Sequence, residues 1–317
     1  MLDYFLFSFS IVFPLFGLCI IGFFLRRADI LDDAFCTKGN LFCFKLAIPC
    51  LLFTNTYSGS VEQINPSLML YVAGLQVSII VIFGLIIPIF FKNNATRGAI
   101  IQAIFRSNSA LFGLPLAISL AGEPAAMTIS IILAVYVPMC NFLAVILLEI
   151  FKPKEEQKGI DFRNMLKSIV TNPMIISTAI ALVFLFSGVH LPQPLYDLTA
   201  SVAKIATPLA LIILGATFNL QKAAGNAVQL GTICLGRLVI VPAAILALSI
   251  YMGCWTNIEI ISLLTTFFGP VAVVSYAQAI ISHSDGELAG QAVVMTTLVS
   301  MVTVTLFIVL IQMLHLI

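Results

Sequence analysis

Charged residues are scarce in this chain. They make up 9% of its 317 residues, whereas hydrophobic residues make up 61%. Soluble domains carry about 25% charged and about 45–50% apolar residues, so the deficit excludes a water-soluble fold. The formal net charge is only +1. This total says nothing about partners, because it hides a strong ordering of the charges along the chain. For a chain confined to the membrane we expect no nucleic-acid partner.

The sequence also lacks the motifs of metal, nucleotide and nucleophilic chemistry. Its seven cysteines include no CxxC pair, and its three histidines have no metal-ligand spacing. There is no GxxxxGK[ST] loop for ATP, and no paired aspartate motif occurs in any of the apolar spans. We expect no cofactor, no metal ion and no enzymatic activity.

Long apolar runs dominate what remains. A transmembrane helix needs about 20 apolar residues, so 317 residues hold about ten spans and little else. The first run, 4–25, has no basic region before it and no small-residue cleavage site, which predicts a retained helix. The expected spans are 4–25, 39–58, 68–91, 98–121, 124–151, 168–187, 194–218, 227–252, 258–281 and 288–316.

The basic residues of the loops predict the orientation of these spans. With both termini extracytoplasmic, every loop Lys and Arg faces the cytoplasm, as the positive-inside rule requires. The loops that then face outwards carry acidic residues and no Lys or Arg. The residues assigned to the cytoplasm are Arg26, Arg27, Lys38, Lys92, Arg97, Lys152, Lys154, Lys158, Arg163, Lys167 and Lys222.

A polar stretch at 152–167 divides the chain into two five-helix halves, 1–151 and 168–317. An odd number of spans in each half predicts an inverted repeat. Local similarities support the repeat. Lys-x-x-x-Pro occurs at Lys45 and again at Lys204, and Phe-Gly-Leu-Pro115 resembles Phe-Gly-Pro270. The sequence therefore predicts an all-α polytopic membrane protein of about ten transmembrane helices in two inverted five-helix repeats.

Four basic residues lie inside the expected spans: Lys45, Arg106, Lys204 and Arg237. An intramembrane charge costs a few kcal/mol, and no Asp or Glu lies deep in any span to neutralise it. A bound anion would supply the missing negative charge. The alternative is that these side chains reach the nearest membrane interface or cap backbone carbonyls.

Polar and helix-breaking residues gather in spans four and nine. Arg106, Asn108 and Pro115 lie within ten residues of one another, and Pro270 precedes Tyr276 and Gln278. A proline removes a helical hydrogen bond and frees backbone groups for a ligand. We expect Pro115 and Pro270 to interrupt their helices and these side chains, with Asn141 and Arg237, to bind substrate. Hydrogen bonding between helices is the alternative for any one of them.

Three motifs resemble those of the auxin efflux carrier family of membrane transporters. They are SNSALFGLPLA around Asn108, the Thr171-Asn172-Pro173 entry to span six, and ATPLALIILGA from Ala206. The likeness covers nearly the whole chain, and the short central loop is similar to that of the bacterial members. The wider fold resembles that of the bile-acid sodium symporters. One departure is that span nine has no asparagine comparable to Asn108 before Pro270.

The resemblance implies a panel domain of spans 1, 2, 6 and 7 and a transport domain of spans 3–5 and 8–10, in which the broken spans four and nine cross. It implies elevator-like alternating access, a homodimer formed through the panel domain, and a coupling ion that is H⁺ or Na⁺. The expected function is secondary active transport, by import or export, of an organic anion such as malate, malonate or an auxin-like acid across the inner cell membrane. A receptor or channel sharing the fold is the alternative.

Overall fold

The computed structural model describes all residues except 1, 59–64, 153–169, 219, 315 and 317, so most of the predicted 152–167 linker lies outside the described residues. Within them the chain is helical and has no strand, apart from one isolated bridge. The elements are α1 (Leu2–Arg27), α2 (Asp33–Phe42), η1 (Cys43–Ala47), α3 (Ile48–Tyr57), α4 (Pro66–Phe90), α5 (Asn94–Phe105), η2 (Ser109–Gly113), α6 (Leu114–Ile150), α8 (Pro173–Ser187), α9 (Gln193–Thr217), α10 (Leu220–Gly225), α11 (Ala227–Leu235), η3 (Gly236–Ile240), α12 (Val241–Met252), α13 (Asn257–Phe268), α14 (Val274–Ile281) and α15 (Gly286–Met313).

Six helical stretches among the described residues are long and apolar enough to cross a bilayer. Two further helices, Pro173–Ser187 and Asn257–Phe268, are apolar but shorter. The chain is thus an all-helical, multi-pass membrane protein, while ten spans in two inverted halves stay a prediction. The six stretches are Asp33–Tyr57, Pro66–Phe90, Met127–Ile150, Gln193–Thr217, Ala227–Met252 and Gly286–Met313.

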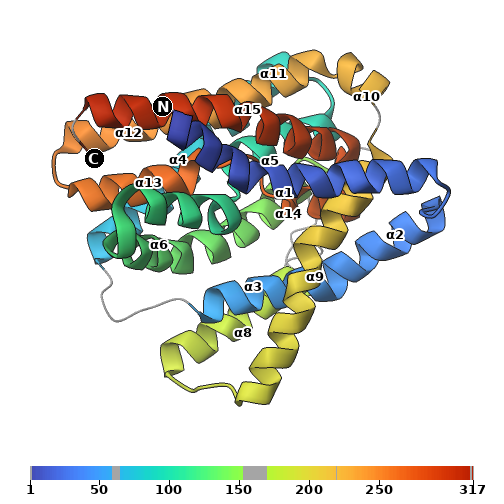
Figure 1. The fold of residues 1–317 in the computed structure, drawn as a ribbon, viewed down its shortest axis with the longest axis horizontal. Helices are drawn as coiled ribbons and strands as arrows, with labels where there is room; N and C mark the ends of the chain where they lie inside the picture. Colours follow the sequence, from blue (N-terminus) through green and yellow to red (C-terminus); the bar gives the residue numbers. More distant parts are fainter. Residues whose placement is uncertain (1, 59–64, 153–169, 219, 315, 317) are drawn as a thin grey trace.

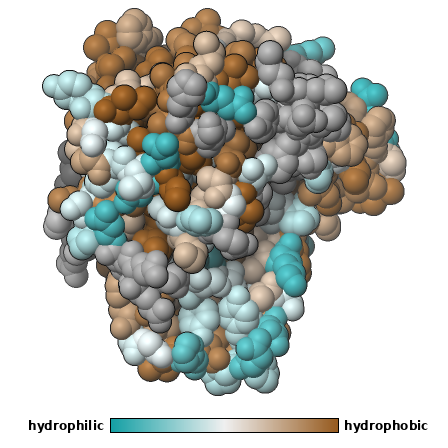
Figure 2. Space-filling model, turned by 60° about the vertical axis from the view of Figure 1, so that its left-hand side comes forward, coloured by the Kyte–Doolittle hydropathy of each residue, from teal (hydrophilic) through white to brown (hydrophobic). Residues whose placement is uncertain are grey.

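The outer surface of these helices is apolar. In α4, Leu70 and Ile89 are each 76% exposed and Leu85 is 70% exposed. Figure 2 shows broad hydrophobic areas on one face of the molecule. Contiguous apolar surface of this kind is rare on soluble monomers. Lipid tails are the natural neighbours of these side chains.

Three π-helical turns occur in the described part of the chain, and a proline follows each. The turns η1, η2 and η3 end two residues before Pro49, Pro115 and Pro242. A proline ring clashes with the carbonyl four residues earlier and cannot donate to it. A wider π turn accommodates the ring without ending the helix.

The expectation that Pro115 interrupts its helix was therefore wrong. Pro115 lies in the first turn of α6, directly after η2. The break lies upstream at residues 106–108, where Arg106 is extended and Asn108 has φ −81° and ψ 56°. The matching break in the second half, residues 269–273, does contain Pro270. Pro115 and Pro270 are thus not equivalent in position.

α6 itself consists of two helices joined at a sharp bend. Ala121 and Gly122 have non-helical backbone angles, and Gly122 has a φ of +68°, which favours glycine. The bend lies between the predicted spans 98–121 and 124–151, so hydropathy placed this boundary well.

The helices pack in two groups (Figure 1). α1 packs against α9, and α3 packs against α8 and α9. On the other side, α6 packs against α4, α5 and α13, and α15 packs against α5, α11 and α14. We name these the α9 group (α1, α2, α3, α8 and α9) and the α6 group (α4–α6 and α11–α15). α1 also contacts α15, so the two groups touch.

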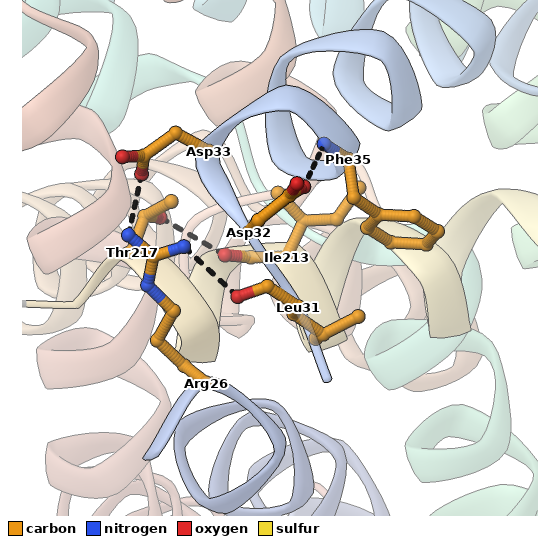
Figure 3. A network of polar contacts seen from close by, with 7 residues as sticks. All are labelled: Arg26, Leu31, Asp32, Asp33, Phe35, Ile213 and Thr217. Atoms are coloured by element: carbon orange, nitrogen blue, oxygen red, sulfur yellow. Dashed lines mark hydrogen bonds and ion pairs between the residues drawn. The ribbon is translucent and has the colours of Figure 1, made fainter. Parts of the chain in front are cut away.

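Arg26 fixes the turn between α1 and α2. Its guanidinium donates to the carbonyl of Leu31 at 2.9 Å and pairs with the carboxylate of Asp33 at 2.6 Å (Figure 3). Asp32 caps α2 by accepting from the backbone N–H of Phe35 at 2.6 Å. Arg26, which the sequence assigns to a cytoplasmic loop, therefore stabilises the turn between α1 and α2.

Candidate functional site

The two breaks pair with each other in the interior. The backbone N–H of Asn108 donates to the Pro270 carbonyl at 2.8 Å, and that of Ala272 donates to the Arg106 carbonyl at 3.2 Å. Ser107 and Val271 thereby form an antiparallel bridge. We call residues 106–108 and 269–273 the crossing. Pairing satisfies the backbone groups that the broken helices leave open, as an apolar environment requires.

Side chains from neighbouring helices hold the crossing in place. The hydroxyl of Tyr136 accepts from the Ser107 N–H at 3.0 Å and donates to the Phe105 carbonyl at 3.3 Å. Thr296 accepts from the Val271 N–H at 3.0 Å. At Gly113, an added Cβ would lie 2.3 Å from the backbone oxygen of Thr265. α13 therefore approaches η2 so closely that only glycine fits there.

Four helix ends meet at the crossing: two C-termini and two N-termini, which carry partial charges of opposite sign. α5 and α13 end there, presenting carbonyl groups, whereas η2 and α14 begin there, presenting N–H groups. Helix C-termini carry partial negative charge and N-termini partial positive charge. The crossing therefore has two partly negative and two partly positive helix ends, and the positive ends, at the starts of η2 and α14, suit an anion.

Arg237 lies against the two C-terminal ends. Its side chain is fully buried, and it donates to the carbonyls of Gly269 at 3.0 Å and Ile104 at 2.8 Å, and also to that of Phe267. Its positive charge thus offsets the negative ends of α5 and α13. Arg237 does not line the cavity described below. Its contacts match the carbonyl-capping alternative.

Arg106 has neutral partners. Its guanidinium donates to the amide oxygens of Gln278 and Asn141, and Gln102 donates to the same Gln278 oxygen at 3.1 Å. Asn141 donates in turn to the Thr178 hydroxyl on α8 at 3.4 Å. Arg106 is 4% exposed. Its charge is held in a fixed position without a carboxylate among the described residues.

A cavity of about 60 Å³ lies at the crossing, between the two helix groups. It has room for several water molecules. From the α6 group it is lined by the crossing, by the first residues of η2 and by one face of α6; from the α9 group it is lined by α3 and Thr207. The lining residues are Leu51, Leu52, Asn55, Arg106, Ser107, Asn108, Ser109, Ala110, Tyr136, Val137, Cys140, Asn141, Thr207, Ala272, Val273 and Val274.

Three asparagines line this cavity, and two of them, Asn108 and Asn55, come from opposite helix groups. Asn108 is 7% exposed and comes from the crossing; Asn55 is half-buried and comes from α3. Among the described contacts neither amide makes a side-chain hydrogen bond. Each amide offers both donors and an acceptor.

The structure brings some of the predicted site residues together and separates others. Arg106, Asn108 and Asn141 line the cavity, and Gln278 lies directly behind Arg106. Pro270 shapes the crossing through its carbonyl. Pro115 is further along the chain, in the first turn of α6.

Tyr276 lies apart from this cavity. It lines a second one, of about 290 Å³, and its hydroxyl is 3.0 Å from that of Thr217 on α9. Lys45 and Lys204 both lie on the exposed surface and line neither cavity. Only two of the four intramembrane cations, Arg106 and Arg237, are therefore buried.

Sequence reasoning missed Asn55, Gln102, Tyr136 and Thr207. Gln102 precedes Arg106 by one helical turn, and Asn55 follows an apolar Leu-Leu-Phe run in span two. An isolated polar residue in an apolar span was the available signal, since such residues normally face the bundle interior.

Comparison with known proteins gives consistent results. The family model described as "Membrane transport protein" matches residues 7–308. A protein of Rhizobium meliloti (strain 1021) named "Putative malonate transporter" is 26% identical over 306 residues, covering 93% of each chain. The range that the family model matches spans both breaks and the residues that line the cavity.

Proposed function

Since the chain belongs to the membrane transport protein family, we propose that it is a secondary active transporter for a small organic anion, bound at the crossing. One observation carries the proposal. Arg106 is the only cationic side chain lining the cavity, and no described acidic residue lines it. A carboxylate would complete this charge and accept from its unused N–H groups.

Asn108 and the start of η2 support the same ligand. The Asn108 amide provides a donor beside Arg106, and Ser109 and Ala110, the first residues of η2, line the same cavity at a helix start, where backbone N–H groups have no acceptor within the helix. Arg237 offsets the negative ends of α5 and α13. The net field at the cavity is therefore positive.

The size of the cavity favours a short-chain acid. About 60 Å³ suits a compact dicarboxylate such as malonate or malate better than an auxin-like acid with a ring system. The name of the relative from Rhizobium meliloti (strain 1021) agrees with this choice.

The mechanism we propose is elevator-like movement of the α6 group against the α9 group. The groups correspond to the transport and panel domains of two inverted five-helix halves, 1–151 and 168–317. The cavity lies between them, so relative movement would expose its occupant to one side and then the other. Side-chain hydrogen bonds that join the groups include Asn141 to Thr178 and Tyr276 to Thr217, which can break and re-form.

Uptake into proteoliposomes tests this function. Purified protein should accumulate labelled malonate or malate against its gradient when a proton or sodium gradient is imposed, and Asn108→Ala should reduce this uptake without loss of folded yield. Flux that only follows the substrate gradient would indicate a channel. Binding without flux would indicate a receptor.

A further inference from the structure

The cavity at the crossing carries one positive charge. Lys45 and Lys204 are exposed elsewhere, and three N–H groups of Arg237 are engaged by backbone carbonyls outside the cavity. Arg106 alone lines the cavity as a cation. A short dicarboxylic acid carries two negative charges when fully ionised. The dianion therefore has one charge more than the single cation of the cavity can neutralise.

We propose that the site takes a dicarboxylic acid as its monoanion, with the carboxylate on Arg106 and the second, protonated carboxyl group on Asn55. This inference rests on the proposed function and deepens it, because it specifies the charge state of the substrate. It also assigns a specificity role to a residue of α3.

Arg106 has the capacity for one carboxylate. A guanidinium has five N–H donors, and contacts with Gln278 and Asn141 engage two of its nitrogens. The remaining donors suffice for a single two-point interaction with a carboxylate. A second ionised carboxylate would find no second cation in the lining of the cavity, and an unpaired charge beside side chains such as Leu51, Leu52 and Val137 is disfavoured.

Asn55 suits a neutral carboxyl group. A protonated carboxyl has one donor and one acceptor, and a primary amide offers the complementary pair. Asn55 faces the cavity from the group opposite Arg106 and makes no side-chain hydrogen bond among the described contacts. An acid that spans the cavity would therefore contact both helix groups, one through each end.

The charge state has a direct consequence for transport. The monoanion exists in solution and binds with its proton already attached, so no proton transfer within the protein is needed. Each molecule moved would carry one negative charge and one dissociable proton, which leaves on the side of release.

The test compares malonate with malonamate, its monoamide, in binding to the purified full-length protein. Malonamate has a single ionisable carboxyl and cannot form a dianion. We expect malonate to bind more tightly as the pH falls from about 7.5 to about 5.5, because the monoanion fraction rises. Malonamate should bind within about threefold of malonate at the lower pH, and its affinity should change little, since its carboxyl stays ionised.

Titration of protein side chains should not contribute to the pH dependence of malonate binding. The titratable residues lining the cavity are Arg106, Tyr136 and Cys140, and Arg237 packs behind the crossing. Arginine, tyrosine and cysteine side chains ordinarily titrate above this pH range. No described His, Asp or Glu lines the cavity.

Asn55→Lys adds a direct control. A second cation should favour the dianion, so the ratio of malonate to malonamate affinity at about pH 7.5 should rise by about tenfold or more. Ser58→Lys, one turn further along and exposed, should leave the ratio unchanged. If the lysine variant does not fold, the wild-type comparison still decides.

Tight malonate binding that is unchanged or stronger at high pH, with malonamate bound more than about thirtyfold more weakly, would overturn the monoanion inference and leave the transporter proposal standing. Failure of malonate, malate and malonamate alike to bind or be transported would instead overturn the proposed function itself, and the inference with it.

Discussion

The backbone N–H of Asn108 donates to the carbonyl oxygen of Pro270 at 2.8 Å, although the two residues lie in opposite halves of the chain. This bond and its partner from Ala272 to Arg106 join the two helix breaks into one paired unit. The candidate site therefore depends on close contact between helices that are far apart in sequence. Substitutions that push these helices apart should damage it.

Gly113→Ala tests this dependence. A Cβ at Gly113 would lie 2.3 Å from the Thr265 carbonyl oxygen, a backbone atom that cannot move without shifting α13. We expect a loss of about 1–3 kcal/mol or more in stability, seen as a lower melting temperature of the purified protein. Gly74→Ala is the matched control, since nothing lies within 4 Å of its added Cβ. It should be neutral or stabilising by about 0.5–1 kcal/mol, because alanine favours a helix interior.

The two kinds of intramembrane cation should behave differently in binding. Arg106→Gln removes the one positive charge that lines the cavity, whereas Lys204→Gln removes an exposed charge. We expect the first change to weaken malonate binding by about ten- to hundredfold, as for the loss of a charge-assisted hydrogen bond. The second should leave the dissociation constant within about twofold. Equal effects of both changes would argue against Arg106 as the anion contact.

Arg237 should matter for stability more than for recognition. Arg237→Gln would leave buried carbonyls of Ile104, Phe267 and Gly269 without their donors. Each buried acceptor that is left without a donor costs about 1–3 kcal/mol. We expect lower folded yield and a lower melting temperature than for Arg106→Gln, measured by size-exclusion profiles after graded heating. An Arg237 variant of wild-type stability that had lost only substrate affinity would favour a direct role in binding.

Tyr276 provides a test of the boundary of the site. It lines the second cavity and contacts Thr217, so Tyr276→Phe should leave malonate affinity within about twofold. The lost hydrogen bond joins the two helix groups, and we expect the transport rate to change instead. Gln278→Leu, which removes a partner of Arg106, should reduce affinity. A Tyr276→Phe variant with clearly weakened binding would place this residue in the substrate site after all.

Local hydropathy was enough to predict the helical class and the position of most apolar helices, because a lipid-facing helix must be apolar along its whole length. It also indicated Arg106 and Asn108, since polar residues are conspicuous in such a helix. These signals are contained within about 20 consecutive residues.

The position of the first break could not be predicted in the same way. Pro115 suggested a break at the proline, but the chain continues from the π turn η2 into α6 through Pro115. The break lies instead at residues 106–108, whose extended backbone is stabilised by pairing with residues 269–273. The roles of Arg237 and Gln278 likewise depend on partners 30 or more residues away. Such contacts leave no pattern in the local sequence.

The orientation in the membrane is the last prediction. The structure joins loops that the predicted topology assigns to the same side: Asn65 donates to Glu259 at 3.1 Å, on the predicted outer side. On the predicted cytoplasmic side, Thr96 donates to Asp285 at 3.1 Å. The positive-inside rule then predicts which of the two sides is cytoplasmic, because the loop that precedes Thr96 carries Lys92.

Cys254 offers a native reporter of this orientation. It is exposed in the loop between α12 and α13, near Glu259, and it is the only exposed cysteine in the described part of the chain. A membrane-impermeant maleimide should label it in intact cells, and Cys254→Ser should abolish that labelling. On the Cys254→Ser background, Lys92→Cys should be labelled only after the cells are permeabilised. The opposite pattern would invert the topology. The two loops lie at opposite ends of helices in the same bundle. Labelling of both positions in intact cells would therefore show that the reagent reaches one of them through the protein. Repeating the reaction with saturating malonate would then reveal whether a bound substrate blocks that route.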